Sequence, residues 1–212
     1  MIWALINDLL QRLVTFNKGD QRRGLSSILR RLNLDAGRKV LDFGCGTALF
    51  APVFRQHRLD YTGYDIDPRL LRYAARLYPD AAFVADGDAL RASAPFDLVI
   101  ANCCFHHIHD EPVAVEVRRI HDLLEDHGTL VLIDLVAGEA GTPLLKRLLF
   151  KLDQGVAIRS HDEYRRLLEP HFIIDATEKL LQPLGPWAQN PLFLELAVFR
   201  CHKIPPSHDA DR

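Results

Sequence analysis

Residues 40–51 read VLDFGCGTALFA. This segment predicts an apolar strand, followed by a glycine-rich turn and the start of a helix. Its first four residues have the character of a buried strand, and apolar residues resume at helical spacing after the turn. Gly44 and Gly46 leave the turn without β-carbons, so backbone N–H groups can come close to a ligand. The segment therefore predicts a ligand site where the first strand meets the first helix.

Strands and helices alternate after this turn. Strands are predicted at residues 39–43, 60–64, 82–85, 96–102 and 130–134, with helices between them at 48–56, 68–77 and 112–124. The run FDLVIAN at 96–102 is continuously apolar, which is typical of a strand buried on both faces. Asp67 is placed to cap the helix that Pro68 opens. This rhythm predicts an α/β fold with a doubly wound parallel sheet.

The rhythm changes after residue 135. Further helices are predicted at 143–152 and 160–168, and two further strands at 172–178 and 192–201. Ser160 and Glu163 have the spacing of a capping box, which marks the start of the second of these helices.

The chain is expected to form one domain with an N-terminal helical cap. An amphipathic helix is predicted at 2–16, a polar loop at 17–23 and a second helix at 24–34. The expected organisation is a cap at 1–35, the domain at 36–202 with substrate-side insertions at 136–160 and 180–191, and a disordered tail at 203–212.

The first helix has two interpretations. Its apolar residues recur at helical spacing and are Ile2, Leu5, Ile6, Leu9, Leu13 and Phe16. We favour packing of this face on the domain. The alternative is peripheral contact with a membrane surface, which would require basic residues on the polar face, where only Arg12 is found.

The bulk composition indicates a soluble, cytoplasmic protein. The 212 residues carry a formal net charge of −2, without the basic excess of a typical nucleic-acid binder. The four cysteines form no CxxC pair, as expected for reduced thiols. The N-terminus lacks the basic start and cleavage site of a signal peptide, and no apolar run reaches the ~20 residues of a membrane span. The composition leaves the oligomeric state open.

Two acidic residues narrow the choice of ligand. Asp42 lies two residues before Gly44, and Asp65 closes the second strand, where an acid suits the hydroxyl pair of a ribose. A dinucleotide fingerprint would need Gly or Ala three positions beyond Gly46, where Leu49 stands. A pyrophosphate on the turn would also be repelled by Asp42. The predicted ligand therefore bears a ribose and a cationic part, without phosphate.

Four segments in order resemble the successive motifs of class I S-adenosylmethionine-dependent methyltransferases. They are VLDFGCGTALFA at 40–51, YDIDP at 64–68, VADGDAL at 84–90 and FDLVIANCCFHHI at 96–108. The resemblance covers roughly residues 38–134 and is specific because four motifs keep the family spacing. It implies a Rossmann-like, mostly parallel seven-stranded sheet with helices on both faces and an antiparallel last strand. It also implies S-adenosylmethionine as cofactor, with S-adenosylhomocysteine as the product.

The resemblance implies roles for five residues around the methionine part of the cofactor. Gly44, Cys45 and Gly46 would border this part. Asp42 would lie at its ammonium side, and Asn102 would lie beside it at the end of the fourth strand. The thiol of Cys45 needs no reactivity in this role.

The adenosine part would be bound by residues that follow the second and third strands. Asp65 would hold the ribose hydroxyls, and Ile66 would pack on the adenine. Asp86 would accept the hydrogens of the adenine amino group, with Gly87 giving a backbone contact. Asp88 is the alternative for this role, but the spacing of the motif favours Asp86.

The residues after the fourth strand bear on the acceptor. Amino methyltransferases of nucleic acids carry an Asn-Pro-Pro-Tyr or -Phe tetrad there, whereas residues 102–105 read Asn-Cys-Cys-Phe. The missing prolines argue against a nucleic-acid acceptor. The run FHHI at 105–108 instead resembles the small-molecule branch of the family (methyltransferase type 11/12-like), where a similar histidine pair often follows this strand.

The two histidines of this run are candidates for acceptor chemistry. Imidazole has an intrinsic pKa suited to a general base near neutral pH. We predict His107 as a catalytic residue and His106 as a substrate-side residue, and the alternative for either is a structural histidine at the sheet edge. The cluster of His, Asp and Glu at 106–111 matches no established ligand spacing, so no metal is expected.

Two residues of less regular segments are candidates for substrate contacts. Arg159 is predicted to bind an anionic group, with pairing to Asp153 or Asp162 as the alternative. Trp187 lies in a proline-rich insertion. We expect such insertions to cover the carboxyl ends of the strands, where ligands bind in open α/β sheets.

These features favour transfer of a methyl group to a small-molecule or lipid-like acceptor at oxygen, nitrogen or carbon, by in-line displacement. One alternative is a protein or RNA methyltransferase on the same fold. Another is a non-catalytic module that binds S-adenosylmethionine, although the glycine turn and the ribose acid are intact. A nicotinamide-dependent oxidoreductase is disfavoured by Leu49 and Asp42.

Overall fold

The computed structural model describes residues 18–137, 157–183 and 193–204 of the chain. The predicted helices at 2–16 and 143–152, Trp187 and nearly all of the predicted tail lie outside these residues.

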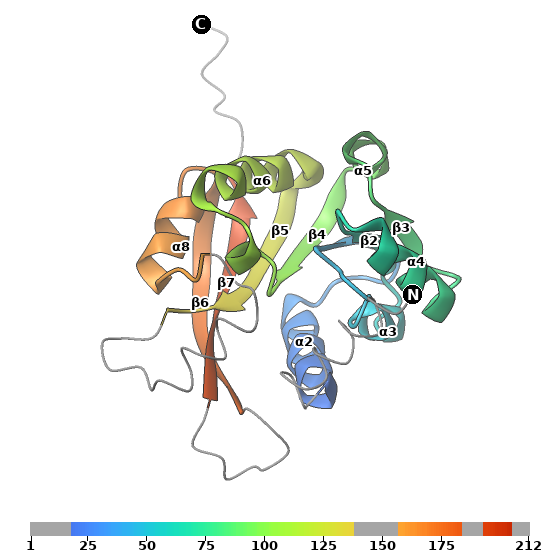
Figure 1. Ribbon diagram of the computed structural model, residues 1–212, viewed down its shortest axis with the longest axis horizontal. Helices are drawn as coiled ribbons and strands as arrows, with labels where there is room; N and C mark the ends of the chain where they lie inside the picture. Colours follow the sequence, from blue (N-terminus) through green and yellow to red (C-terminus); the bar gives the residue numbers. More distant parts are fainter. Residues whose placement is uncertain (1–17, 138–156, 184–192, 205–212) are drawn as a thin grey trace, which may run out of the picture.

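One seven-stranded sheet forms the centre of the protein, with strand order β3-β2-β1-β4-β5-β7-β6 (Figure 1). The strands are β1 (Lys39–Phe43), β2 (Asp60–Tyr64), β3 (Ala82–Val84), β4 (Phe96–Asn102), β5 (Leu124–Leu135), β6 (Phe172–Pro183) and β7 (Phe193–Lys203). The first five strands run parallel, and β7 is antiparallel to both of its neighbours. The predicted α/β fold with an antiparallel last strand is confirmed.

Helices cover both faces of this sheet and bury two separate hydrophobic clusters (Figure 1). One face is covered by α2 (Lys18–Leu32), α3 (Ala51–Gln56) and α4 (Pro68–Leu77). The other is covered by α5 (Gly87–Ser93), α6 (Asp110–Leu123) and α8 (His161–Leu168), with a 3-10 turn, η1 (Phe105–His107), before α6. Strand β4 supplies side chains to both clusters, which explains its continuous apolar run.

Two predicted helix starts are confirmed by their caps. The carboxylate of Asp67 accepts the N–H of Arg69 at 2.8 Å, directly before Pro68. Ser160 accepts the N–H of Glu163, whose carboxylate accepts the N–H of Ser160 in return, which completes the capping box.

Several element predictions differ from the structure: strand β6 extends to Pro183 instead of ending at 178, β7 to Lys203 instead of 201, and α3 begins at Ala51 instead of 48. Three further differences have a visible physical reason. Helix α2 begins at Lys18, inside the predicted loop, because Arg22 ties this polar segment to the domain by donating to the carbonyl of Leu49 at 2.9 Å. The short helix α5 was not predicted, and its start depends on the side chain of Asp86. Strand β5 begins at Leu124 rather than residue 130, because Leu124 already pairs with Phe96 before a register shift.

Candidate functional site

The glycine turn after β1 is fixed to the end of β2. The N–H groups of Gly44 and Cys45 both donate to the carbonyl of Tyr64, at 2.8 and 2.9 Å. Gly44 has a φ of 73° and Gly46 a φ of 54°, in the left-handed region that favours glycine. A β-carbon on Gly44 would lie 2.7 Å from the β-carbon of Cys104. Position 44 therefore requires glycine both for its backbone conformation and for space.

Asp65 bridges the turn and the start of α4. Its Oδ2 accepts the N–H of Gly46 at 2.8 Å, and its Oδ1 accepts the N–H of Asp67 at 2.9 Å. Burial raises the pKa of Asp65, although both N–H groups and the nearby His107 act in the opposite direction. Each carboxylate oxygen can accept a further hydrogen bond, which is what a pair of ribose hydroxyls would donate. Next to it, Ile66 is 81% exposed and offers a flat apolar surface.

Asp42 is a buried carboxylate beneath the turn, 2% exposed. The hydroxyl of Tyr61 donates to its Oδ2 at 3.1 Å. Burial raises the pKa of Asp42 to about 7, with a smaller contribution from the charge of Asp65, while the Tyr61 hydrogen bond opposes the shift. The negative charge of each carboxylate disfavours ionisation of the other. A cationic ligand would stabilise the ionised form of both.

Asp86 and Gly87 begin helix α5 on the next strand connection. Oδ1 of Asp86 accepts the N–H groups of Asp88 and Ala89 at 2.8 and 3.0 Å, and these bonds lower its pKa. A β-carbon on Gly87 would lie 2.0 Å from Nη2 of Arg119, whose other terminal nitrogen donates to the hydroxyl of Tyr64. Arg119 of α6 therefore packs against Gly87 and helps to fix the position of this connection. The sequence does not indicate this packing role.

The chain leaves the sheet sharply after Asn102, the last residue of β4. Cys103 has a φ of 50°, which is uncommon for a residue with a side chain, and its N–H donates to the carbonyl of Ile133 at 2.8 Å. This turn directs the following residues across the carboxyl end of β5.

The segment that follows β4, residues 103–110, is called the histidine loop here. Asp134 of β5 accepts hydrogen bonds from the N–H donors of this loop. Its Oδ2 accepts the backbone N–H groups of Phe105 and His106, at 2.8 and 3.3 Å. Its Oδ1 is hydrogen bonded to the ring Nδ1 of His106. Asp134 and His106 are each 1% exposed, so this is a buried pair beneath the loop.

His107 has a different environment from its neighbour. Its side chain is exposed, and its ring centroid lies 4.0 Å from that of His106. Burial raises the pKa of Asp65 and the charge of His107 opposes this shift, so the ring lies within electrostatic range of that carboxylate.

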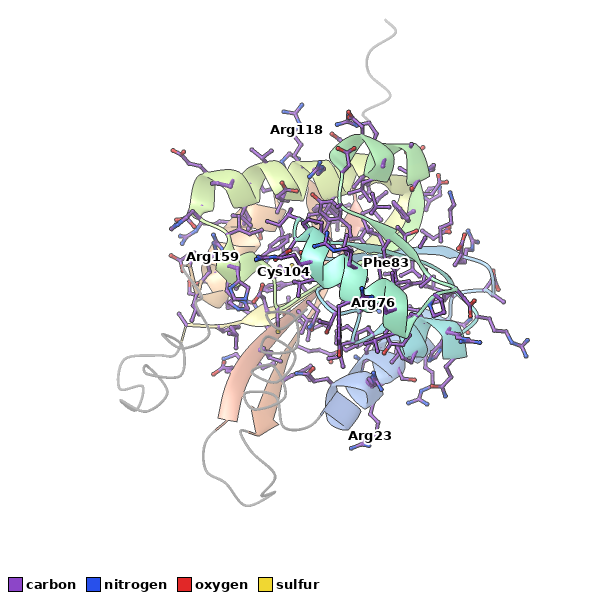
Figure 2. All side chains as sticks on the ribbon, turned by 45° about the vertical axis from the view of Figure 1, so that its right-hand side comes forward. Arg23, Arg76, Phe83, Cys104, Arg118 and Arg159 are labelled. Atoms are coloured by element: carbon purple, nitrogen blue, oxygen red, sulfur yellow. The ribbon has the colours of Figure 1, made fainter. Side chains whose placement is uncertain are left out.

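Arg159 binds the acceptors of the histidine loop (Figure 2). Its guanidinium is 5% exposed and contacts Asp110 through Nε and Nη2, at 3.0 and 2.8 Å. The remaining hydrogens are donated to the carbonyls of Phe105, Ile108 and Ala157, at 2.9, 2.7 and 3.2 Å. All five N–H donors of Arg159 are thus directed to the protein itself, and its carboxylate partner is Asp110.

The structure brings together most of the predicted site residues at the carboxyl ends of the parallel strands. Asp42, Asp65, Asp86 and Asn102 belong to or directly follow β1 to β4. Trp187 lies outside the described residues. Tyr61, Arg119 and Asp134 were not predicted, and of these only Asp134 carried a signal, as an acid at the end of a predicted strand. Among the described residues, no group of three His, Cys, Asp or Glu side chains is arranged to hold a metal ion.

This fold and site define a class I S-adenosylmethionine-dependent methyltransferase. The chain belongs to the methyltransferase domain family, whose model matches residues 16–171. The sequence-based identification of the family and of its cofactor is thereby confirmed. In the part of the chain that the structure describes, no helix is long and apolar enough to cross a membrane.

Curated relatives and solved structures agree with this membership. An uncharacterized methyltransferase of Mycobacterium tuberculosis is 34% identical over 122 residues, covering 56% of this chain and 58% of that protein. One from Bacillus velezensis is 29% identical over 117 residues, covering 54% of this chain and 55% of that protein. The matched segment thus spans little more than half the length of these relatives.

Two solved structures share the fold. Magnesium protoporphyrin IX methyltransferase from Synechocystis, with bound S-adenosylhomocysteine, has a TM-score of 0.68 and 17% identity, over 92% of this chain and 87% of that one. Phosphoethanolamine N-methyltransferase 2 of Haemonchus contortus has a TM-score of 0.66 and 17% identity, over 88% of this chain and 52% of that one.

Gly44→Ala tests the geometry of the turn. We expect it to lower the free energy of unfolding by about 2 kcal/mol or more, since it combines left-handed strain with a clash against Cys104. Gly24→Ala in α2 is the control, because a β-carbon there meets nothing within 4 Å. Equal urea unfolding midpoints for the two variants would show that the turn tolerates a side chain.

Asp42→Asn tests the buried carboxylate. The raised pKa of Asp42, about 7 against an ordinary 3.8, means that the folded state keeps this proton longer than the unfolded state. Its stabilising contribution is complete below the ordinary pKa and is lost as the pH rises through about 7. Relative to wild type, the variant should therefore melt higher at pH 8 than at pH 5, by about 3 °C or more. Parallel melting curves at both pH values would contradict this role.

Proposed function

We propose that this chain transfers the methyl group of S-adenosylmethionine to a small-molecule or lipid-like acceptor at oxygen, nitrogen or carbon. The observation that carries the proposal is the joined arrangement of the glycine turn and Asp65. The carboxylate holds the turn through Gly46 and keeps acceptor capacity on both oxygens, next to the buried Asp42. This arrangement suits a ligand with a ribose at one end and positive charge at the other.

The residues present fit the two ends of the cofactor. Asp65 would accept the ribose hydroxyls, Ile66 would pack on the adenine, and Asp86 would accept the adenine amino hydrogens beside Gly87. The methionine end would lie against the remaining predicted residues, which are Asp42, Gly44, Cys45, Gly46 and Asn102. When bound, the cofactor supplies a methyl group already activated on a sulfonium, so the protein contributes chiefly alignment.

His107 is the proposed general base for acceptors that must lose a proton. Its ring is exposed, lies at a tilt against the ring of His106, which Asp134 holds in place, and is close enough to Asp65 to affect its pKa. His106 and Arg159 were expected from sequence to face the substrate. In this proposal they would instead hold the histidine loop in place through their buried hydrogen bonds. A purely structural role for His107 is the competing interpretation.

The acceptor is proposed to be a cytoplasmic metabolite or lipid. Two structural neighbours are named for small acceptors, magnesium protoporphyrin IX and phosphoethanolamine, and this supports the small-molecule class. The Asn-Cys-Cys-Phe sequence at 102–105 and the net charge of −2 support it further against a nucleic-acid acceptor.

A labelled-methyl assay tests the acceptor class. The full chain is incubated with methyl-labelled S-adenosylmethionine and cell lysate, which is then separated into protein, nucleic acid, lipid and small-molecule fractions. We expect label in the small-molecule or lipid fraction and none with Asp65→Ala, which loses the charge-assisted bonds to ribose. Label in the protein or RNA fraction would establish the alternative, and no transfer to any fraction would contradict methyl transfer.

His107→Asn tests the general base once an acceptor has been identified. We expect kcat to fall about a hundredfold or more, with loss of the acidic limb of the pH profile and little change in cofactor affinity. His109→Asn is the matched control, since His109 is exposed and makes no side-chain cap bond at the start of α6. If both variants retain kcat, His107 has no catalytic role.

A further inference from the structure

The two helical layers of this protein carry opposite charge. Helices α2, α3 and α4, which we call the arginine layer, contain nine Lys and Arg residues and one acidic residue. Helices α5, α6 and α8 on the other face contain five basic and seven acidic residues. A chain with a net charge of −2 thus concentrates positive charge on one side of its sheet.

The arginines of this layer point to solvent because the helices bury their opposite sides. The buried residues of α2, α3 and α4 that face the same core cluster are Leu25, Ile28, Leu29, Ala51, Val53, Phe54 and Ala74. The exposed arginines of the layer and its connections are Arg23, Arg30, Arg31, Arg55, Arg58, Arg69, Arg72 and Arg76. Figure 2 labels Arg23 and Arg76 on this side and Arg118 on α6 of the opposite layer.

Carboxylates of the described residues neutralise part of the layer. Arg31 pairs with Glu178, Arg55 with Asp80 and Arg69 with Asp67. Within the described ranges, no carboxylate pairs with Arg30, Arg58 or Arg72. Solvent-facing helices usually mix basic and acidic residues. An excess of basic residues on adjacent helices produces a positive electrostatic potential that attracts an anionic partner.

We propose that the arginine layer is a docking surface for an anionic lipid bilayer. Each arginine near such a surface adds to the attraction, which acts within a Debye length and is weakened by salt. The exposed Leu77 at the end of α4 adds an apolar contact beside Arg76.

A nucleic acid is less well matched to this surface. Proteins that bind single strands stack bases on exposed aromatic side chains. The large apolar side chains that are exposed in the described part of the chain are all aliphatic: Ile66, Leu77, Val115, Ile173 and Ile204. The layer thus offers positive charge and aliphatic contacts, which fit lipid headgroups better than bases.

The first turn of α4 connects the arginine layer to the cofactor site. Helix α4 begins three residues after Asp65 and directly follows Asp67. Binding of the arginine layer to an anionic bilayer would not depend on whether the chain transfers methyl groups.

Vesicle co-sedimentation of the full chain tests the proposal. Vesicles of phosphatidylcholine alone are compared with vesicles of equal parts phosphatidylcholine and phosphatidylglycerol, at about 0.1 and 0.5 M salt. We expect binding to the anionic vesicles only, and weaker binding at the higher salt. The double variant Arg30→Glu/Arg72→Glu should bind about tenfold more weakly or worse. The control Arg118→Glu/Arg166→Glu makes the same charge change on exposed residues of α6 and α8 and should bind within about twofold of wild type.

Several outcomes would overturn the proposal, provided that melting curves show both variants folded. These are no binding of wild type to anionic vesicles, equal binding to neutral vesicles, or an equal loss in the two double variants, which would reflect bulk charge. Retained binding in Arg30→Glu/Arg72→Glu would assign the contact to another segment. Salt-sensitive binding of a homopolymer RNA without vesicle binding would make the layer a nucleic-acid surface instead.

Discussion

The carboxylate of Asp65 holds the centre of this site together. It accepts the N–H of Gly46 from the turn after β1 and the N–H of Asp67 from the start of α4. The turn itself is tied to the end of β2 through the carbonyl of Tyr64. Two adjacent parallel strands and the helices that follow them are thus locked by one side chain and one carbonyl. Because the same carboxylate is only partly buried and keeps acceptor capacity, the side chain that shapes the turn is also the one that would recognise the ribose.

The parallel strands deliver a polar residue to the same edge one after another. Asp42, Asp65 and Asp86 surround the cofactor side, and burial raises the pKa of the first two. Asp134 serves the acceptor side by binding the donors of the histidine loop, while Arg159 binds its acceptors. On the proposed cofactor side, a cationic ligand would therefore stabilise the charged forms of Asp42 and Asp65, whereas the donors and acceptors of the histidine loop are paired within the protein. This division matches a reaction in which alignment of the acceptor is the main task of the protein.

Much of the fold follows from sequence because its signals are local. Strands β1, β2 and β4 have the predicted bounds, since each is a short run rich in apolar, aromatic or β-branched residues next to turn residues. The caps at Asp67 and Ser160 depend on residues only two or three positions away. The acids predicted to bind the cofactor follow or end strands at motif spacing, which is also a local signal. By contrast, no local signal in the sequence indicates that His106 is buried and His107 is exposed. Their difference arises from Asp134, 28 residues further along the chain, which buries one ring and leaves the other exposed.

Arg159 illustrates the same limit. It was predicted to bind an anionic group or to pair with Asp153 or Asp162, but the fold brings Asp110, 49 residues away, within 2.8 Å, together with three carbonyls. Arg119 lies behind Gly87 for a similar reason, because α6 crosses the start of α5 only in the folded protein. Partners of long cationic side chains depend on tertiary packing, which periodicity and motif spacing do not encode.

The central claim is that the turn and its acids form a site for S-adenosylmethionine. Calorimetric titration of the purified chain with S-adenosylhomocysteine and, separately, with a nicotinamide dinucleotide tests it most directly. The account predicts micromolar binding of S-adenosylhomocysteine, weakened at least about tenfold by Asp65→Ala, and no binding of the dinucleotide. Absence of binding by S-adenosylhomocysteine, or tighter binding of the dinucleotide, would contradict it.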